Sequence, residues 1–308
     1  MTTFWKLYEN FYKGFEMKLM IAIPVYNRKQ YLEITAKSLY ECSNVNKSII
    51  KVFNDCSTEF DSDYLRQLFN KFNAWIVDGE NNLKADRHTY KIILDFLNTE
   101  NDVLFICDSD LLLRPDAIDY ILNNFDRTDG FLGLYNSELH RDIYFDGEFV
   151  YKENVGFAGI CVSKDLLQKF VLKQEGNSGC MDFILSDFLI DNGIRLMVPK
   201  NCYVQHIGFY GQNCSSSSVE FSTNFMPLSE FNKEIVNKML PMALKIQANV
   251  IKYLLFEDKY RKHGFMLHQT RSYFARNRKI KALKKYYAQK YPIRVVDGKN
   301  VENLKMRK

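Results

Sequence analysis

Several features that mark membrane, secreted or fibrous proteins are missing from this chain. It has no uninterrupted run of about 18 apolar residues, so we expect no transmembrane helix. Lysine and glutamate interrupt the apolar residues of segment 1–15, which breaks up the apolar centre that a signal peptide needs. Its 6 prolines and 14 glycines are too few for a collagen or a low-complexity chain. We therefore expect a globular protein that stays in the cytoplasm.

Paired cysteines are missing too. No CxxC spacing occurs, which excludes the common zinc-binding patterns and the disulfide framework of a small secreted domain. The chain also lacks a recognised nucleic-acid-binding motif and the glycine- and lysine-rich phosphate loop of a nucleotidyltransferase. We expect buried free thiols in a reducing compartment and no nucleic-acid partner. The seven cysteines stand singly at positions 42, 56, 107, 161, 180, 202 and 214.

What the chain does have is an uneven distribution of charge. The net charge of all 308 residues is +5, but residues 250–308 hold 17 Lys and Arg against 4 Asp and Glu. The remaining residues are acidic, with 25 basic against 33 acidic side chains. A basic end on an acidic body favours an anionic partner such as a phospholipid surface or an acidic glycan. We predict an N-terminal extension (1–17), a domain over 18–224 and a basic helical region over 225–308.

Short apolar runs alternate with segments of helical spacing in the first third of the chain. The runs lie at 18–27, 48–53, 75–77 and 102–107, and each ends in polar residues. This alternation predicts an α/β fold in which a mostly parallel sheet carries helices on both faces. Ligands of such sheets bind at the carboxyl ends of the strands. The residues at those ends are Tyr26, Asn27, Asp55, Asp108 and Asp110.

A mixed region after the first four strands predicts an antiparallel addition to the sheet. Its apolar segments are 131–134, 143–145 and 149–151. Past residue 225 the strand signals stop, and Pro241 is predicted to be the first residue of a helix.

Apolar residues recur every three or four positions among lysines and arginines from Arg271 to Tyr291. This spacing predicts a basic amphipathic helix, or two, which we expect to dock on an anionic membrane surface or an acidic acceptor. A helical cap on the acidic body and a contact in a homodimer are the alternatives.

The strongest single motif is Asp108-Ser109-Asp110, which follows the apolar run 103–107. Two carboxylates two residues apart can face one hard cation, and such a cation neutralises a diphosphate. The same residues could instead form a turn with a helix cap. We favour the metal site because the other polar strand ends are predicted to lie at the same edge of the sheet.

Four segments together resemble the GT-A fold glycosyltransferases, which use nucleotide sugars, and are most similar to glycosyltransferase family 2. The resemblance covers about residues 18–210. Two departures matter: Cys56 stands where the family usually has glycine, and the glycine of the N-x-G stretch is missing. The matching segments are Ile21–Arg28, Asn54–Ser57, Asn82–Arg87 and the motif Asp108–Asp110.

The resemblance implies how this chain would hold a nucleotide-sugar donor. Pro24, Tyr26 and Arg28 would line the nucleotide pocket, and Asp55 would accept a hydrogen bond from the base, which suits an N–H of uracil or thymine. Arg87 would lie near the diphosphate or the donor sugar. Asp55 could instead form a turn after its strand, and Arg87 could be a solvated helix residue.

The DxD motif and the segments downstream have implied roles as well. Asp108, with Ser109, would contact the ribose or sugar hydroxyls, and Asp110 would bind Mn²⁺ or Mg²⁺. The stretch 156–159 resembles the small residues beneath the donor sugar. Asp182 is our choice for the base that deprotonates the acceptor in inverting transfer, ahead of Asp187. Either could instead be a charge on a helix surface.

His206 ends an apolar segment, and several GT-A enzymes supply a third metal ligand from this region. Neutral imidazole suits manganese, although a lone histidine is more often structural. Gly208, Gly211 and the serines 215–218 form either a mobile flap over the donor or an ordinary surface loop.

These expectations combine into one function. The chain is predicted to be a metal-dependent glycosyltransferase of polysaccharide biosynthesis. It would move a sugar from a nucleotide-diphosphate donor, with a UDP-sugar favoured, to a glycan or another hydroxyl acceptor. A retaining enzyme and a non-catalytic relative that binds nucleotide sugars or glycans are the alternatives. A cytoplasmic location, possible attachment to the inner face of the membrane and a homodimer complete the prediction.

Overall fold

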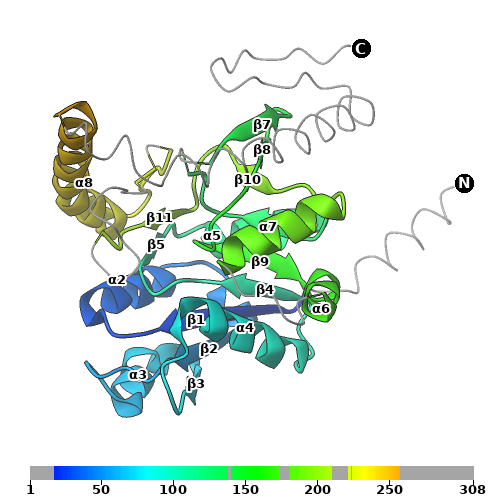
Figure 1. Ribbon diagram of the computed structural model, residues 1–308. Helices are drawn as coiled ribbons and strands as arrows, with labels where there is room; N and C mark the ends of the chain where they lie inside the picture. Colours follow the sequence, from blue (N-terminus) through cyan, green and yellow to red (C-terminus); the bar gives the residue numbers. More distant parts are fainter. Residues whose placement is uncertain (1–16, 138–139, 174–179, 210–220, 223, 257–308) are drawn as a thin grey trace, which may run out of the picture.

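Strand β1 (Leu19–Val25) lies inside the sheet because both of its faces are apolar. Leu19, Ile21 and Ile23 face one buried cluster, and Met20 and Ala22 face the other. The computed structural model describes residues 17–137, 140–173, 180–209, 221–222 and 224–256. In this part of the chain, nine strands form one sheet with helices on both faces (Figure 1).

The sheet has a parallel half and a largely antiparallel half. Its order is β3-β2-β1-β4-β9-β6-β10-β8-β7. The first four strands in this order, from β3 to β4, are parallel to one another. Strand β9 pairs antiparallel with both β4 and β6. The strands beside β1 are β2 (Ile49–Asn54), β3 (Trp75–Asp78), β4 (Val103–Ile106), β6 (Phe131–Gly133), β7 (Asp142–Phe145), β8 (Phe149–Lys152), β9 (Ile160–Ser163) and β10 (Met197–Pro199).

The antiparallel addition predicted from the sequence is confirmed at β6, β7 and β8, and the α/β class is confirmed with it. Strand β9, between β4 and β6, was not predicted as a strand. It follows Gly159, whose φ of 70° turns the chain into the sheet. The residues just before β9 are those of the stretch 156–159, which resembles the small residues beneath the donor sugar.

The two faces of the sheet have different helices. On the first lie α2 (Lys29–Tyr40), α3 (Ser62–Leu68), α5 (Ala117–Asn124) and α8 (Glu230–Phe256). On the second lie α4 (Lys84–Leu97), α6 (Lys164–Leu172) and α7 (Met181–Asp191). Three short 3₁₀ turns complete the described helices, at Val45–Lys47, Asn70–Phe72 and Phe125–Arg127.

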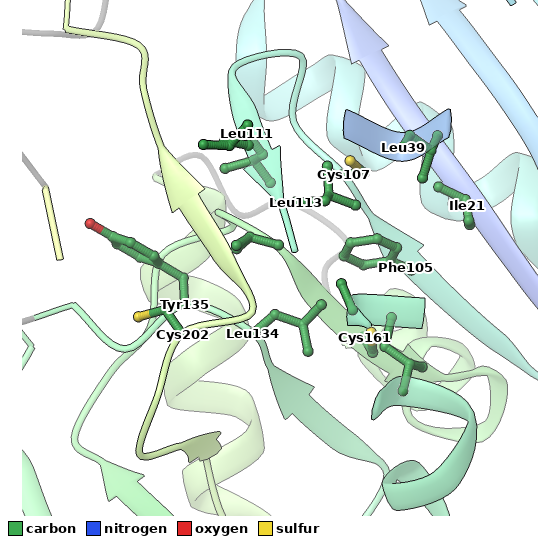
Figure 2. Packing of buried hydrophobic residues seen from close by; sticks show 14 of the residues in the cluster. Ile21, Leu39, Phe105, Cys107, Leu111, Leu113, Leu134, Tyr135, Cys161 and Cys202 are labelled. Atoms are coloured by element: carbon green, nitrogen blue, oxygen red, sulfur yellow. The ribbon is translucent and has the colours of Figure 1, made fainter. Parts of the chain in front are cut away.

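A second, two-stranded sheet joins the DxD segment to a late part of the chain. Strand β5 (Leu111–Leu113) pairs antiparallel with β11 (Val204–His206). Leu111 and Leu113 lie in the same apolar cluster as Phe105 of β4 and Cys107, which directly follows β4 (Figure 2). Burial of β5 therefore fixes the residues directly before it against the carboxyl end of β4.

Helix α8 differs from the sequence-based expectation. Pro241 lies inside this helix rather than at its start. The helix begins earlier because Ser229 Oγ accepts the Asn232 N–H at 3.1 Å, which satisfies one of the free donors of the first turn. Burial of Ile235 and Met239 holds the helix to the body before Pro241 is reached.

The first half of α8 belongs to the core of the preceding domain. Phe225, Ile235, Met239 and Ala243 are all part of the apolar cluster on the first face of the sheet. The start of the predicted C-terminal region, up to Ala243, therefore packs on the predicted domain 18–224. The basic helices predicted over 271–291 and the extension 1–16 lie outside the described residues. Within the described residues, every helix is too short or too polar to cross a bilayer.

Candidate functional site

Hydrogen bonds between backbone N–H groups and side-chain oxygens join the loops at the carboxyl ends of β1 and β2. Asn27 Oδ1 accepts the N–H of Thr58 at 2.7 Å and that of Glu59 at 3.2 Å. In return, Asn27 N–H donates to Ser57 Oγ at 3.0 Å. The loops that follow the two strands therefore form one rigid rim, as expected for polar residues that follow neighbouring parallel strands.

Left-handed backbone is concentrated at this rim. Arg28 (φ 61°), Cys56 (φ 62°) and Lys84 (φ 67°) adopt it although each carries a Cβ atom. This conformation costs about 1–2 kcal/mol per residue, so it persists only where the surroundings enforce it, commonly at binding sites. Cys56 stands where the resembling family has glycine, and the structure shows that the position keeps the backbone shape that glycine favours.

Asp55 closes the turn that leads into α4. Its Oδ1 accepts the N–H of Leu83 at 2.8 Å, and its Oδ2 accepts that of Lys84 at 3.1 Å. The residue is only 3% exposed. The nearby His88 is also buried, and burial lowers its pKa although the charge of Asp55 partly offsets this. Asp55 thus ties the carboxyl end of β2 to the start of α4, which is a different role from a turn after its own strand, and its contact with a base stays a prediction.

Asp110 is the buried acid around which the other groups gather. Its Oδ2 accepts a hydrogen bond from Arg28 Nη2 and lies 3.2 Å from His206 Nε2. Burial alone would raise the pKa of this carboxyl, but His206 and Arg28 hold it well below its usual range. Asp110 is therefore an anion at any physiological pH.

Strand pairing explains how His206 reaches Asp110. In the β5–β11 ladder His206 is opposite Leu111, the residue after Asp110. The N–H of Ile207 then donates to the backbone oxygen of Asp110 at 2.9 Å. Gly208 lies so close to Asp110 and Arg28 that a Cβ atom at this position would overlap both Asp110 Oδ2 and Arg28 Nη2. The site thus depends on a residue without a side chain at this position.

The pKa of Asp108, the other acid of the motif, is shifted in the opposite direction to that of Asp110. Burial and the charge of Asp110 raise the pKa of Asp108 to about 7, while His206 and Arg28 partly oppose the increase. The charge of Asp182 also raises this pKa, which places Asp182 within electrostatic reach. A carboxyl that is partly protonated near neutral pH can donate as well as accept hydrogen bonds, and this suits contact with a hydroxyl group.

Asp182 and Asp187 have different surroundings on α7. Asp182, in the first turn, is half-buried, and its Oδ1 lies 2.8 Å from both Cys180 Sγ and the Phe183 nitrogen, which donate to it. Asp187 is exposed. The N–H of Met181 donates to Asp86 Oδ1 at 2.9 Å, which joins the start of α7 to α4. The charge of Asp182 acts on Asp108 of the DxD motif.

The remaining predicted donor residues are more dispersed. Pro24 is in β1, and Tyr26 is the first residue after this strand. Both are half-buried and close to Arg28 in the sequence. Ser109 is half-buried between the two acids of the motif. Arg87 is exposed in the first turn of α4, the surroundings of a solvated helix residue. Of the predicted flap, Gly208 is buried, while 211 and 215–218 lie outside the described residues.

The described residues contain no group of three His, Cys, Asp or Glu side chains arranged to hold a metal ion. They do offer a carboxylate and an imidazole side by side, with Asp110 Oδ2 3.2 Å from His206 Nε2. This donor pair fits Mn²⁺ or Mg²⁺, which keep several waters and take few protein ligands when phosphate oxygens supply the rest. The metal prediction is therefore compatible with the residues present.

Two features of the site were not found from the sequence. The pairing of Arg28 with Asp110 joins residues 82 positions apart, and only the order of strands could have suggested it. The second feature is the hydrogen bond from the Cys180 thiol to Asp182. The only indication of it in the sequence is weak: the two residues are two positions apart at the start of a helix.

Comparison with known proteins gives matches among solved structures alone. No family model and no curated protein matches the chain. TarS 1–349 of S. aureus, solved in complex with UDP, is 14% identical, with 92% of this chain and 95% of that chain covered and a TM-score of 0.49. A mannosyltransferase, PcManGT from Pyrobaculum calidifontis, solved with GDP-Man and Mn²⁺, is 13% identical, with 90% and 87% covered and a TM-score of 0.47. A longer TarS structure is 14% identical with a TM-score of 0.48, and this chain spans 45% of its length.

Proposed function

We propose that this chain is a GT-A type glycosyltransferase, of the kind that family 2 represents, and that it takes a nucleotide-sugar donor. The observation that carries the proposal is the meeting of Asp110, Arg28 and His206 at the carboxyl edge of the sheet. The charges of these three residues and of Asp182 all act on the pKa of Asp108. Acids of unequal pKa beside an arginine and a histidine suit a donor that has both a diphosphate and hydroxyl groups.

Each residue has a proposed part in the reaction. Asp110 and His206 would hold Mn²⁺ or Mg²⁺, which supplies charge neutralisation for the diphosphate leaving group. Asp108 would bind a hydroxyl of the ribose or donor sugar. Asp182 would accept the proton of the acceptor hydroxyl at its carboxylate as the new glycosidic bond forms, with inversion at the sugar carbon. Pro24, Tyr26 and Asp55 would enclose the nucleotide base, for which we favour uracil.

The attachment of the protein to a surface is a separate part of the proposal. The basic segment 250–308 would bind an anionic membrane or an acidic glycan acceptor, because its excess of Lys and Arg is attracted to either. Most of this segment lies outside the described residues.

A donor panel tests the function. UDP-, GDP- and dTDP-sugars are titrated into the full chain by calorimetry, with and without Mn²⁺, and released nucleoside diphosphate is measured with glycan acceptors. We expect metal-dependent binding of one donor class and its loss in Asp110→Asn. Asp126→Asn removes a similar charge from an exposed 3₁₀ turn and should leave binding unchanged. A chain that binds no nucleotide sugar under any condition would overturn the proposal, while binding without turnover would identify a non-catalytic relative.

A further inference from the structure

The carboxylate proposed to bind a metal already has a cation from its own chain. Arg28 Nη2 donates to Asp110 Oδ2, the same oxygen that lies 3.2 Å from His206 Nε2. The side chain of Asp110 is 9% exposed and that of Arg28 is 29% exposed. This ion pair is therefore sheltered from water on the Asp110 side and open to solvent on the Arg28 side.

The local structure is built to bring this arginine to this acid. Arg28, the residue directly before α2, has a left-handed backbone conformation at φ 61°, and its guanidinium carbon lies 4.9 Å from the centre of the Tyr31 ring. Gly208 provides the space, because any larger residue there would overlap both members of the pair. The left-handed backbone of Arg28, its cation–π contact with Tyr31 and the absence of a Cβ atom at Gly208 are all consistent with the Arg28 guanidinium lying beside Asp110.

The protein alone offers few metal ligands. Among the described residues no third His, Cys, Asp or Glu completes a site with Asp110 and His206. Without phosphate oxygens, a divalent cation would therefore gain few protein ligands and would compete with the guanidinium for a sheltered carboxylate. With a diphosphate present, Arg28 has another anion to bind, and guanidinium pairs with phosphate in a bidentate manner.

We propose that Arg28 makes metal binding depend on nucleotide binding. In the free protein Arg28 occupies Asp110 and weakens the binding of a divalent cation. When a nucleoside diphosphate arrives, the guanidinium transfers to its phosphates and frees the carboxylate. By linkage, the nucleotide raises the affinity for the metal and the metal raises the affinity for the nucleotide. This inference rests on the proposed function, and it assigns to Arg28 a coupling role in addition to lining the nucleotide pocket.

The test is a titration of Mn²⁺ alone, without nucleotide, followed by the electron paramagnetic resonance signal of free Mn²⁺. Arg28→Met keeps an unbranched side chain but removes the charge. We expect it to bind Mn²⁺ about 10-fold more tightly than the wild-type protein, within the usual range of coupling factors. Lys29→Met removes the same charge from the next residue, which contacts the Tyr64 ring instead, and should not change the affinity. Arg28→Gln is the second variant if Arg28→Met does not fold.

A second titration, in the presence of saturating UDP, measures the coupling. UDP should increase the Mn²⁺ affinity of the wild-type protein by a larger factor than that of Arg28→Met. An unchanged or weaker Mn²⁺ affinity in Arg28→Met and Arg28→Gln without nucleotide would overturn the inference and leave the proposed function standing. If the wild-type protein binds neither Mn²⁺ nor any nucleotide of the donor panel, both proposals fail.

Discussion

At the scale of single residues, Gly208 is important because it lacks a Cβ atom, which leaves room for the Arg28–Asp110 pair. Gly208→Ala would place a Cβ atom on Asp110 Oδ2 and Arg28 Nη2, so both side chains, or the backbone at residue 208, must move. We expect metal-dependent nucleotide binding to fall by about 10- to 100-fold, because small displacements of site groups have effects of this size. Calorimetry with Mn²⁺ and the preferred donor measures the loss.

The matched control for Gly208 is Gly147, in the turn between β7 and β8. Its φ is 103°, and an added Cβ atom would meet no atom within 4 Å. Gly147→Ala should therefore reduce stability by about 1–2 kcal/mol through backbone strain and leave binding intact. Equal binding losses in the two variants would show that the effect of Gly208→Ala is a general one.

Asp182 and Asp187 provide a second residue-scale prediction. Asp182→Asn keeps the size of the side chain but cannot accept a proton, so transfer should fall by about 10²- to 10⁴-fold while donor binding survives. Asp187→Asn changes an exposed residue five positions later and should have little effect. Rates with saturating donor and acceptor measure both variants. An inactive Asp187→Asn beside an active Asp182→Asn would contradict the assignment, and a product that keeps the donor's anomeric configuration would remove the need for this base.

His88 gives the protein a pH-dependent stability. Because burial lowers its pKa in the folded protein, the unfolded chain binds more protons as the pH falls below the ordinary histidine value. Its contribution to stability is thus complete above about pH 6.5 and is lost as the pH falls through that value toward the folded pKa. Urea unfolding at pH 7.5 and pH 5.5 should show a larger loss for the wild-type protein than for His88→Gln. Parallel losses would count against a buried, neutral His88.

At the scale of elements, α8 and β5 are joined by one buried side chain. Asn232 is fully buried, and its Nδ2 donates to the backbone oxygen of Leu113 at 3.0 Å. Asn232→Asp would turn this donor into an unpaired buried carboxylate and should reduce the free energy of unfolding by about 3–5 kcal/mol at pH 7, with less effect at pH 4. Denaturant unfolding measures the change. Asn237→Asp, on the exposed side of α8, should stay within about 0.5 kcal/mol of the wild-type value, and a similar loss there would contradict the role of Asn232.

Elements with strong periodicity were predictable from the sequence. The four parallel strands, their polar ends and the antiparallel addition follow from apolar runs and turn residues, which act locally. Strand β9 was missed because the small residues before it resemble a donor-site segment, and only its pairing with β4 and β6, which are distant in sequence, makes it a strand. Pro241 was misplaced because burial of Ile235 and Met239, a tertiary effect, starts the helix before the proline.

The residues of the candidate site could be predicted from the sequence, but the contacts between them could not. Asp108 and Asp110 were recognisable as a pair because they follow a buried strand. That Arg28 binds Asp110, and that Asp55 binds the backbone at 83 and 84, depends on which strand ends become neighbours and on side-chain direction. No local pattern contains that information.

At the scale of the whole molecule, the separation of charge leads to a prediction about surfaces. Deletion of residues 271–308 removes much of the basic segment and should reduce co-sedimentation with anionic liposomes in low salt, while hydrolysis of the donor continues. The deleted residues lie outside those that the structure describes. Neutral liposomes are the control. Binding by the full chain that is absent, or that does not weaken with added salt, would contradict attachment to a membrane.

The pairing of β5 with β11 also sets an order of events during synthesis. Asp110 leaves the ribosome 96 residues before His206, an interval of about 5–20 s at ordinary rates of translation. Arg28, by contrast, is synthesised before Asp110. A nascent chain can therefore neutralise this acid with an internal cation and bury the end of β4 while the histidine is still unmade.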